Sequence, residues 1–150
     1  MLHIALFEPE IPPNTGNIAR LCAATGTRLH LIGRLGFRLD DKSLQRAGLD
    51  YWDAVDVVRH VTFEEFERSF TGRLWLVETP AVRLYTQVEY QDGDGLLFGS
   101  ESKGLPPGLR ERLSEQVIGI PMPSGRVRSL NLATSAGITL YEAMRQIHAW

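Results

Sequence analysis

The chain has 150 residues, 43% of them hydrophobic, and a formal net charge of −2. This length and apolar share argue against disorder and suit a single domain, expected over residues 1–150. No apolar run approaches the ~20 residues that span a bilayer, which argues against a membrane protein. The start, Met1–Glu8, lacks the basic and cleavage regions of a signal peptide, and the lone Cys22 forms no internal disulfide. We therefore expect a cytoplasmic protein.

Basic residues gather toward the two ends of the chain. Residues 1–50 carry six Lys/Arg against five Asp/Glu, residues 51–100 carry four against nine, and residues 101–150 carry six against four. Fourteen of the sixteen basic residues are Arg, which suits bidentate contacts to phosphate. A general bias toward Arg over Lys explains the count equally well.

Short apolar runs alternate with helical patterns along the chain. The runs predict strands at His3–Phe7, Arg28–Ile32, Leu74–Val77, Leu96–Gly99 and Val117–Ile120. The helical spacing predicts helices at Asn17–Thr25, Asp41–Ala47, Phe63–Ser69, Pro107–Leu113 and Leu130–His148. Such alternation is typical of an α/β fold with a mostly parallel sheet flanked by helices. Ligands of such sheets bind beyond the carboxyl ends of the strands.

The first segment at that edge, Pro12–Arg20, leaves the first predicted strand and opens a helix. Pro and Gly set the turn, and an Asn of this segment can cap the helix. Apolar residues at helical spacing define a core-facing side, so Asn17 and Arg20 fall on the opposite side. In this interpretation Arg20 points from the first helical turn toward the crevice. A solvated Arg on a polar face is the simpler alternative.

The second segment, Gly95–Pro106, is an apolar run that ends in a glycine turn, a pattern that brings bare backbone close to a ligand. Gly99–Gly104 matches neither GxGxxG nor GxxxxGK[ST], so it is not a familiar phosphate loop. A ligand held mainly by backbone groups, such as an adenine ring and ribose, fits better. Glu101 has three open roles: to orient a nearby loop, to accept from a ligand hydroxyl, or to be a charge at a helix N-terminus.

The third segment, Pro121–Asn131, joins an apolar strand to the last helix. Ser129 is the expected N-cap of that helix, whose N-terminus favours a polar or negative ligand group. Arg126 and Arg128 lie in this loop, and with Arg20 they form a candidate phosphate-binding patch. The four histidines are isolated in the sequence from one another and from the cysteine, so no metal site is expected.

The last helix carries an unusually broad apolar surface. More than half of its circumference is covered by Leu132, Ala133, Ala136, Gly137, Leu140, Tyr141, Met144 and Ile147. A helix that packs on one sheet face needs a narrower stripe. We expect this helix to pack against both the sheet and a second subunit, the alternative being a helix deep in its own core.

Four ordered motifs give the chain a resemblance to a known family. They are Phe7–Asn17 with Arg20, Arg46–Tyr51, Phe98–Pro106 and Ser129-Leu130-Asn131-Leu132. On these motifs the chain resembles the SPOUT class of S-adenosylmethionine-dependent RNA methyltransferases over Met1–Gln146. Within that class it is similar to the small tRNA wobble-nucleoside 2′-O-methyltransferases of the TrmL or YibK type. One departure is Ser100-Glu101-Ser102-Lys103-Gly104, where a relative has Pro-Glu-Thr-Arg-Gly.

The resemblance implies a trefoil knot in the C-terminal part of the sheet and a homodimer packed through the first and last helices. It implies S-adenosylmethionine as cofactor, bent within the knot. The implied cofactor contacts are Val77, Gly99, Ile120, Ser129 and Leu130, followed by Asn131 as the motif's asparagine. Arg20 takes the place of the family's catalytic arginine. The expected RNA contacts are Asn14, Asn17, Arg126 and Arg128.

The implied reaction is methyl transfer to the ribose 2′-hydroxyl of the wobble nucleotide, cytidine 34 or uridine 34, of tRNA. The expected partners are tRNA and a second copy of the chain, with no membrane and no metal. Two alternatives stay open: a dimeric RNA- or cofactor-binding module without catalysis, and a 2′-O-methyltransferase that acts at another RNA position. Because a guanidinium stays protonated, Arg20 is expected to hold phosphate and stabilise the developing alkoxide, although the class also admits the arginine as a base.

Overall fold

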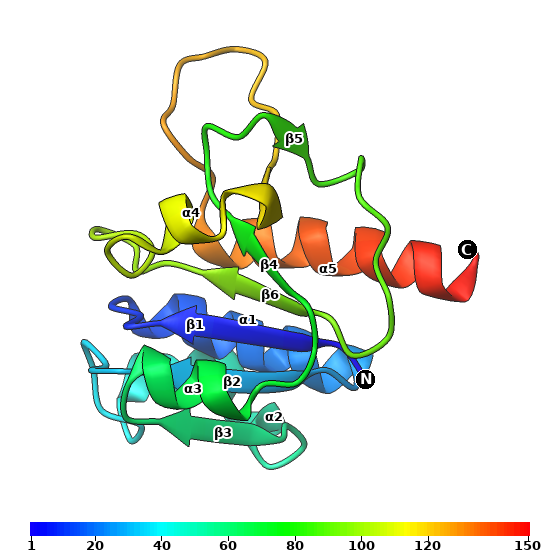
Figure 1. Ribbon diagram of the computed structural model, residues 1–150. Coiled ribbons are helices and arrows are strands. Elements are labelled where there is room, and N and C mark those ends of the chain that lie inside the picture. Colours follow the sequence, from blue (N-terminus) through cyan, green and yellow to red (C-terminus); the bar gives the residue numbers. More distant parts are fainter.

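Seven parallel strands form one sheet in the order β3-β2-β1-β6-β4-β7-β5 (Figure 1). The computed structural model describes the backbone of residues 1–150 and all side chains except those of Gln45 and residues 47–50. The strands are β1 (His3–Phe7), β2 (Arg28–Ile32), β3 (Val57–His60), β4 (Leu74–Val77), β5 (Arg83–Leu84), β6 (Gly95–Phe98) and β7 (Val117–Gly119). Every recorded pairing between neighbours is parallel, which confirms the predicted α/β class.

Helices cover both faces of the sheet (Figure 1). They are α1 (Pro12–Thr25), α2 (Lys42–Trp52), α3 (Phe63–Ser69), α4 (Leu109–Arg112) and α5 (Leu132–His148), and a short 3₁₀ helix, η1, spans Ser114–Gln116. One core cluster joins the sheet to α1 and α5, and a second joins the other face to α3 and α4. Because both faces are covered, β6 reads as the continuous apolar run Gly95–Phe98, buried throughout.

The predicted strands and helices are largely confirmed, and their boundaries shift for local reasons. α1 begins at Pro12 instead of Asn17, because proline fits the first helical turn. Asn14 therefore lies inside the helix and does not cap it. α5 begins at Leu132, and its N-cap is Asn131, which accepts from Thr134 N at 3.1 Å, instead of Ser129.

Two other predicted helices also have different ends. α2 extends to Trp52, well past the predicted end at Ala47, and the side chains of 47–50 lie outside the described residues. α4 is confined to Leu109–Arg112, shorter than the predicted Pro107–Leu113. α5 exposes 48% of Tyr141, so it is not buried entirely in its own core.

Three of the histidines that the sequence places apart lie in one hydrogen-bonded row across β1, β2 and β3. His3 Nδ1 is 2.9 Å from His30 Nε2, and His30 Nδ1 is 2.9 Å from His60 Nε2. The rings of Phe66 and Phe70 cover them. Burial lowers the pKa of His30 to about 3, with smaller contributions from its charged neighbours. The ring nitrogens bond to one another, and the described side chains contain no group of three or more His, Cys, Asp or Glu that could hold a metal ion.

The strand register brings the loops of interest together. Leu6 of β1 lies opposite Phe98 of β6, Phe98 lies opposite Val77 of β4, and Val77 lies opposite Ile118 of β7. The segments that follow these four strands therefore leave the sheet side by side at its carboxyl edge. Within the described part of the chain, no helix is both long and apolar enough to cross a membrane.

Candidate active site

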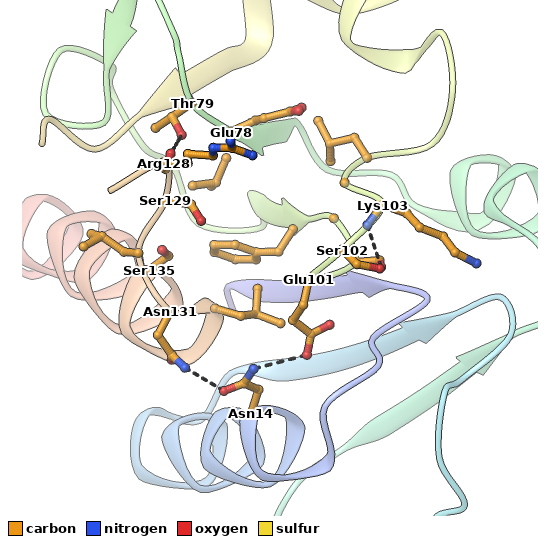
Figure 2. A pocket seen from close by; sticks show the side chains of 18 of the residues that line it. Asn14, Glu78, Thr79, Glu101, Ser102, Lys103, Arg128, Ser129, Asn131 and Ser135 are labelled. Carbon is orange, nitrogen blue, oxygen red and sulfur yellow. Dashed lines mark hydrogen bonds between the residues drawn. The ribbon is translucent and has the colours of Figure 1, made fainter. Parts of the chain in front are cut away.

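A cleft of about 560 Å³ opens at the carboxyl edge of the sheet, beyond β4, β6 and β7 (Figure 2). Its apolar lining includes Val77, Phe98 and Ile120 from the ends of these strands. Its polar lining includes Ser129 and Ser135. This volume and mixture of apolar surface with a few polar groups are typical of a small-molecule site.

All five residues that the resemblance assigns to the cofactor line this cleft: Val77, Gly99, Ile120, Ser129 and Leu130. They come from three segments that are distant in the sequence and meet only in the fold. The cleft also includes Thr79, whose hydroxyl donates to the backbone oxygen of Arg128 at 3.3 Å. This contact ties the segment after β4 to the loop before α5 (Figure 2).

Gly99 is required by the tight turn that follows β6. Ser100 N donates to Gly104 O at 3.0 Å, and Gly104 N donates back to Ser100 O at 2.9 Å. A Cβ at Gly99 would lie 2.2 Å from the carbonyl carbon of Gly104 and 2.4 Å from Leu105 N. Only glycine therefore lets the two ends of the turn approach this closely.

Glu10 anchors this turn from the neighbouring loop. Its carboxylate accepts from Ser102 N at 2.8 Å, from Ser102 Oγ at 2.6 Å and from the hydroxyl of Ser100. The hydrogen bonds from Ser100, followed by those from Ser102, lower the pKa of Glu10 to about 2. The carboxylate is thus held in its charged form as part of the turn.

Glu101, which lies in the turn after β6, in turn binds the backbone of the loop that carries Glu10. Its carboxylate accepts from the backbone N–H groups of Glu10 and Ile11, each at 2.9 Å, at the start of α1. An anion is favourable at a helix N-terminus, so Glu101 serves as the cap that Ile11, the N-cap residue, cannot supply. Of its three open roles, the structure shows two: Glu101 orients a nearby loop, and it is a charge at a helix N-terminus.

A relay of side-chain amides extends this network to α5. Asn14 Nδ2 donates to Glu101 at 3.2 Å, and Asn131 Nδ2 donates to Asn14 Oδ1 at 2.9 Å (Figure 2). Asn131 Oδ1 then caps α5. Glu101, Asn14 and Asn131 therefore join all three loops of the cleft, and only 6% of Asn14 is exposed.

The predicted RNA-contact residues are not gathered in one place. Asn14 and Arg128 line the cleft, whereas Asn17 and Arg126 are exposed outside it. Arg20 is also exposed and does not line the cleft of its own chain. The reason is the early start of α1: Arg20 follows Asn14 by six residues, or about 9 Å of helix.

Sequence reasoning did not single out Glu10, Thr79 or Ser135. Glu10 lies within the Phe7–Asn17 motif, which was the available signal for it. Thr79 and Ser135 belong to no motif and enter the cleft only through the fold. The network of Glu10 and Glu101 was invisible because their loops are about 90 residues apart.

The cleft suits a nucleoside-like ligand. A flat apolar ring would meet Val77, Ile120 and Leu130, while exposed backbone near Gly99 offers donors and acceptors to its polar groups. Ser129 and Ser135 add hydroxyl groups to the lining (Figure 2). Glu78 places a carboxylate in the lining. Its Oε2 accepts no hydrogen bond from a described group but lies 3.7 Å from the guanidinium of Arg110, with which it forms an ion pair.

Comparison with known proteins agrees with this geometry. A sequence profile of the SpoU rRNA methylase family matches residues 1–141. A protein of Escherichia coli named tRNA (cytidine(34)-2′-O)-methyltransferase is 50% identical, covering 98% of this chain and 94% of its own. A structure solved to study the 2-OH methylation of C/U34 on tRNA superposes with a TM-score of 0.92 and 45% identity, over 100% of this chain and 98% of that one.

A more distant structure adds a bound ligand. The SpoU methyltransferase AviRb from Streptomyces viridochromogenes, in complex with the cofactor AdoMet, has a TM-score of 0.81 and 28% identity, over 97% of this chain and 57% of its own. The resemblance seen in the motifs is thereby confirmed over nearly the whole chain. On sequence and on fold together, the chain belongs to the SpoU rRNA methylase family.

Proposed function

We propose that this protein transfers a methyl group from S-adenosylmethionine to the ribose 2′-hydroxyl of cytidine 34 or uridine 34 in tRNA. The observation that carries this proposal is the convergence of three distant loops on one cleft that contains all five expected cofactor residues. The name of the E. coli relative and the stated subject of the structure with a TM-score of 0.92 support the choice of tRNA and of nucleotide 34.

The cofactor's place follows from the cleft. Val77, Ile120 and Leu130 would pack against the adenine ring, and the backbone at Gly99 and the Ser129 hydroxyl would meet its polar groups. When bound, S-adenosylmethionine supplies a methyl group activated on a cationic sulfur. The protein's own task is to align the ribose oxygen with that methyl carbon.

Arg20 is the proposed catalytic residue; because it lies outside the cleft of its own chain, we propose that it acts at the cleft of the second subunit of a homodimer. Methylation would require the ribose 2′-hydroxyl to lose its proton, which the RNA phosphate or water would accept. A guanidinium stays protonated and cannot accept that proton. We therefore assign Arg20 to the phosphate beside the target ribose and to the negative charge that develops on the 2′-oxygen.

RNA binding falls to exposed groups around the cleft. Asn17, Arg126 and Arg128 are exposed, and neither arginine takes part in an ion pair with a described residue, so their donors are available to phosphate. Asn14 is different, because its amide is already bonded to Glu101 and Asn131. We assign Asn14 to positioning the loops instead of contacting RNA.

We also propose a homodimer packed through α1 and α5. These helices lie together on one face of the sheet, and α5 and its C-terminal end expose 48% of Tyr141 and 63% of Trp150 (Figure 1). We also propose a trefoil knot, which membership of the family supports. We propose a location in the cytoplasm, which the tRNA substrate named for the E. coli relative supports. Sedimentation of the wild type and of Tyr141→Arg tests the dimer: a monomeric wild type would overturn it.

The decisive experiment incubates the protein with methyl-labelled S-adenosylmethionine and tRNA from cells that lack the modification. We expect label in tRNA, mapped to the 2′-oxygen of nucleotide 34. Cofactor binding without any label would indicate a binding module that has lost catalysis. Label at another nucleotide would keep the reaction and correct the substrate.

A further inference from the structure

The Arg20 guanidinium lies over the ring of Tyr51, with its central carbon 5.0 Å from the ring centroid. Tyr51 belongs to the last turn of α2, and α2 packs along α1. Arg20 forms no ion pair with any side chain that the structure describes. Among the side chains that the structure describes, the Tyr51 ring is the recorded contact of this guanidinium.

Stacking on an aromatic face differs physically from pairing with a carboxylate. A carboxylate would occupy the in-plane N–H donors of the guanidinium and cancel its charge, whereas a ring face leaves donors and charge available. Arginine is suited to this arrangement because its planar group stacks, which a lysine ammonium does not do in the same way. The ring also limits the rotamers of a long, exposed side chain.

We propose that Tyr51 is a positioning residue for Arg20: its ring holds the guanidinium plane on the exposed side of α1 with the N–H donors directed to the RNA. This inference rests on the proposed function, since Arg20 must act on the RNA for its orientation to matter. It assigns a role to the end of α2, none of whose described side chains lines the cofactor cleft.

The test compares Tyr51→Leu with Tyr51→Phe and Tyr51→Trp, which keep an aromatic face. An exposed cation–π contact corresponds to about a two- to five-fold effect, so Tyr51→Leu should weaken tRNA binding by that factor. Its kcat should fall further, by up to about 100-fold, because misplaced groups slow chemistry more than binding. Tyr51→Phe and Tyr51→Trp should stay within about two-fold of wild type, and the Kd for S-adenosylmethionine should not change in any variant.

A double-mutant cycle separates positioning from a general structural effect. In an Arg20→Ala background, Tyr51→Leu should cause no further loss of tRNA affinity, because the group that it positions is gone. Arg68→Ala, an exposed charge on α3 at the other face of the sheet, is the matched charge control and should change little.

Each outcome has a definite meaning. Equal losses from Tyr51→Leu in both backgrounds, or a Tyr51→Leu variant that matches wild type, would overturn the inference while leaving the proposed function intact. Tyr51→Phe losing as much as Tyr51→Leu would also overturn it, because the ring face would then not be the active feature. A wild-type protein that neither binds nor methylates tRNA would overturn the proposed function and this inference with it.

Discussion

Glu10 and Glu101 each stabilise the loop that carries the other. Glu101 accepts from the backbone N–H of Glu10 at 2.9 Å, while Glu10 accepts from Ser102 N at 2.8 Å, one residue beyond Glu101. The exchange joins the start of α1 to the turn at Gly99. The turn that lines the cofactor cleft and the helix that carries Arg20 are therefore held as one unit.

Removal of the Glu101 carboxylate should weaken this unit. Glu101→Ala leaves the N–H groups at the start of α1 without their acceptor, and we expect the free energy of unfolding to fall by about 1–3 kcal/mol. The Kd for S-adenosylmethionine should rise as well. Urea unfolding and calorimetry measure the two effects, with the exposed Glu115→Ala as control. Equal stability of the two variants would argue against the capping role.

Gly99→Ala should abolish cofactor binding while the rest of the sheet stays folded. The new Cβ would lie 2.2 Å from the backbone of Gly104, so the turn would have to open. Thr71→Ala is the control, because Thr71 is exposed in the segment between α3 and β4 and does not line the cleft. Calorimetric titration with S-adenosylmethionine separates them, and unchanged binding by Gly99→Ala would contradict this account of the turn.

Arg20→Lys should lower kcat without altering the pH dependence of the reaction. A lysine keeps the positive charge and loses the planar, multidentate donors, so both phosphate contact and stabilisation of the 2′-oxygen should weaken. The rate should be measured across pH at saturating S-adenosylmethionine. A profile whose acidic or basic limb moves with the substitution would instead indicate that Arg20 takes part in the proton transfer.

The histidine row should make stability depend on pH. The pKa of His30 is about 3 in the folded protein and near 6.5 when unfolded, so below pH 6.5 the unfolded chain binds more protons. The contribution of His30 is complete above pH 6.5 and is lost as pH falls toward 3. Between pH 6.5 and 5 the loss should be about 2 kcal/mol.

Urea unfolding at pH 6.5 and pH 5 measures this loss. His30→Phe keeps an aromatic ring beside Phe66 and removes the titrating group, so its stability should change less with pH than that of wild type. His148→Gln, at an exposed position, should behave as wild type. If the free energy of unfolding changed with pH equally in His30→Phe and in wild type, other groups would be responsible for the pH dependence.

Cys22 should be inert in the folded protein. Its thiol is 1% exposed, and burial raises its pKa to about 12, so thiolate is scarce at neutral pH. A thiol reagent should therefore modify the protein only at urea concentrations that unfold it. Rapid modification in buffer alone would contradict the packing of α1 on the sheet.

The sheet was largely predictable because most of its strands are buried on both faces. Leu74–Val77 and Arg28–Ile32 match the predicted bounds: the first is a continuous apolar run, and the second has three apolar residues around His30. β3 was missed because only Val57 and Val58 of its four residues are apolar, and the partner of His60 is a histidine in another strand. β5 has only two residues and forms through its pairing with β7, which local sequence does not encode.

The site was predictable where it depends on motifs and unpredictable where it depends on distant side chains. The resemblance supplied five residues that share one cleft. The N-cap of α5 was misplaced because Ser129 and Asn131 are both capping types, and only the contact with Thr134 N distinguishes them. Helical periodicity shows on which side of α1 Arg20 lies but not how far along the helix axis it lies. For that reason Arg20 was wrongly expected in the crevice.

The bond between Asn14 and Asn131 also sets the order of events during synthesis. These residues are 117 positions apart, and a ribosome that adds about 5–20 residues per second needs roughly 6–23 s to make the intervening chain. The start of α1 must wait for that interval before its partner in α5 exists. The cleft that we propose for the cofactor is therefore among the last parts of the molecule to form, and we expect no binding of S-adenosylmethionine there until α5 has emerged.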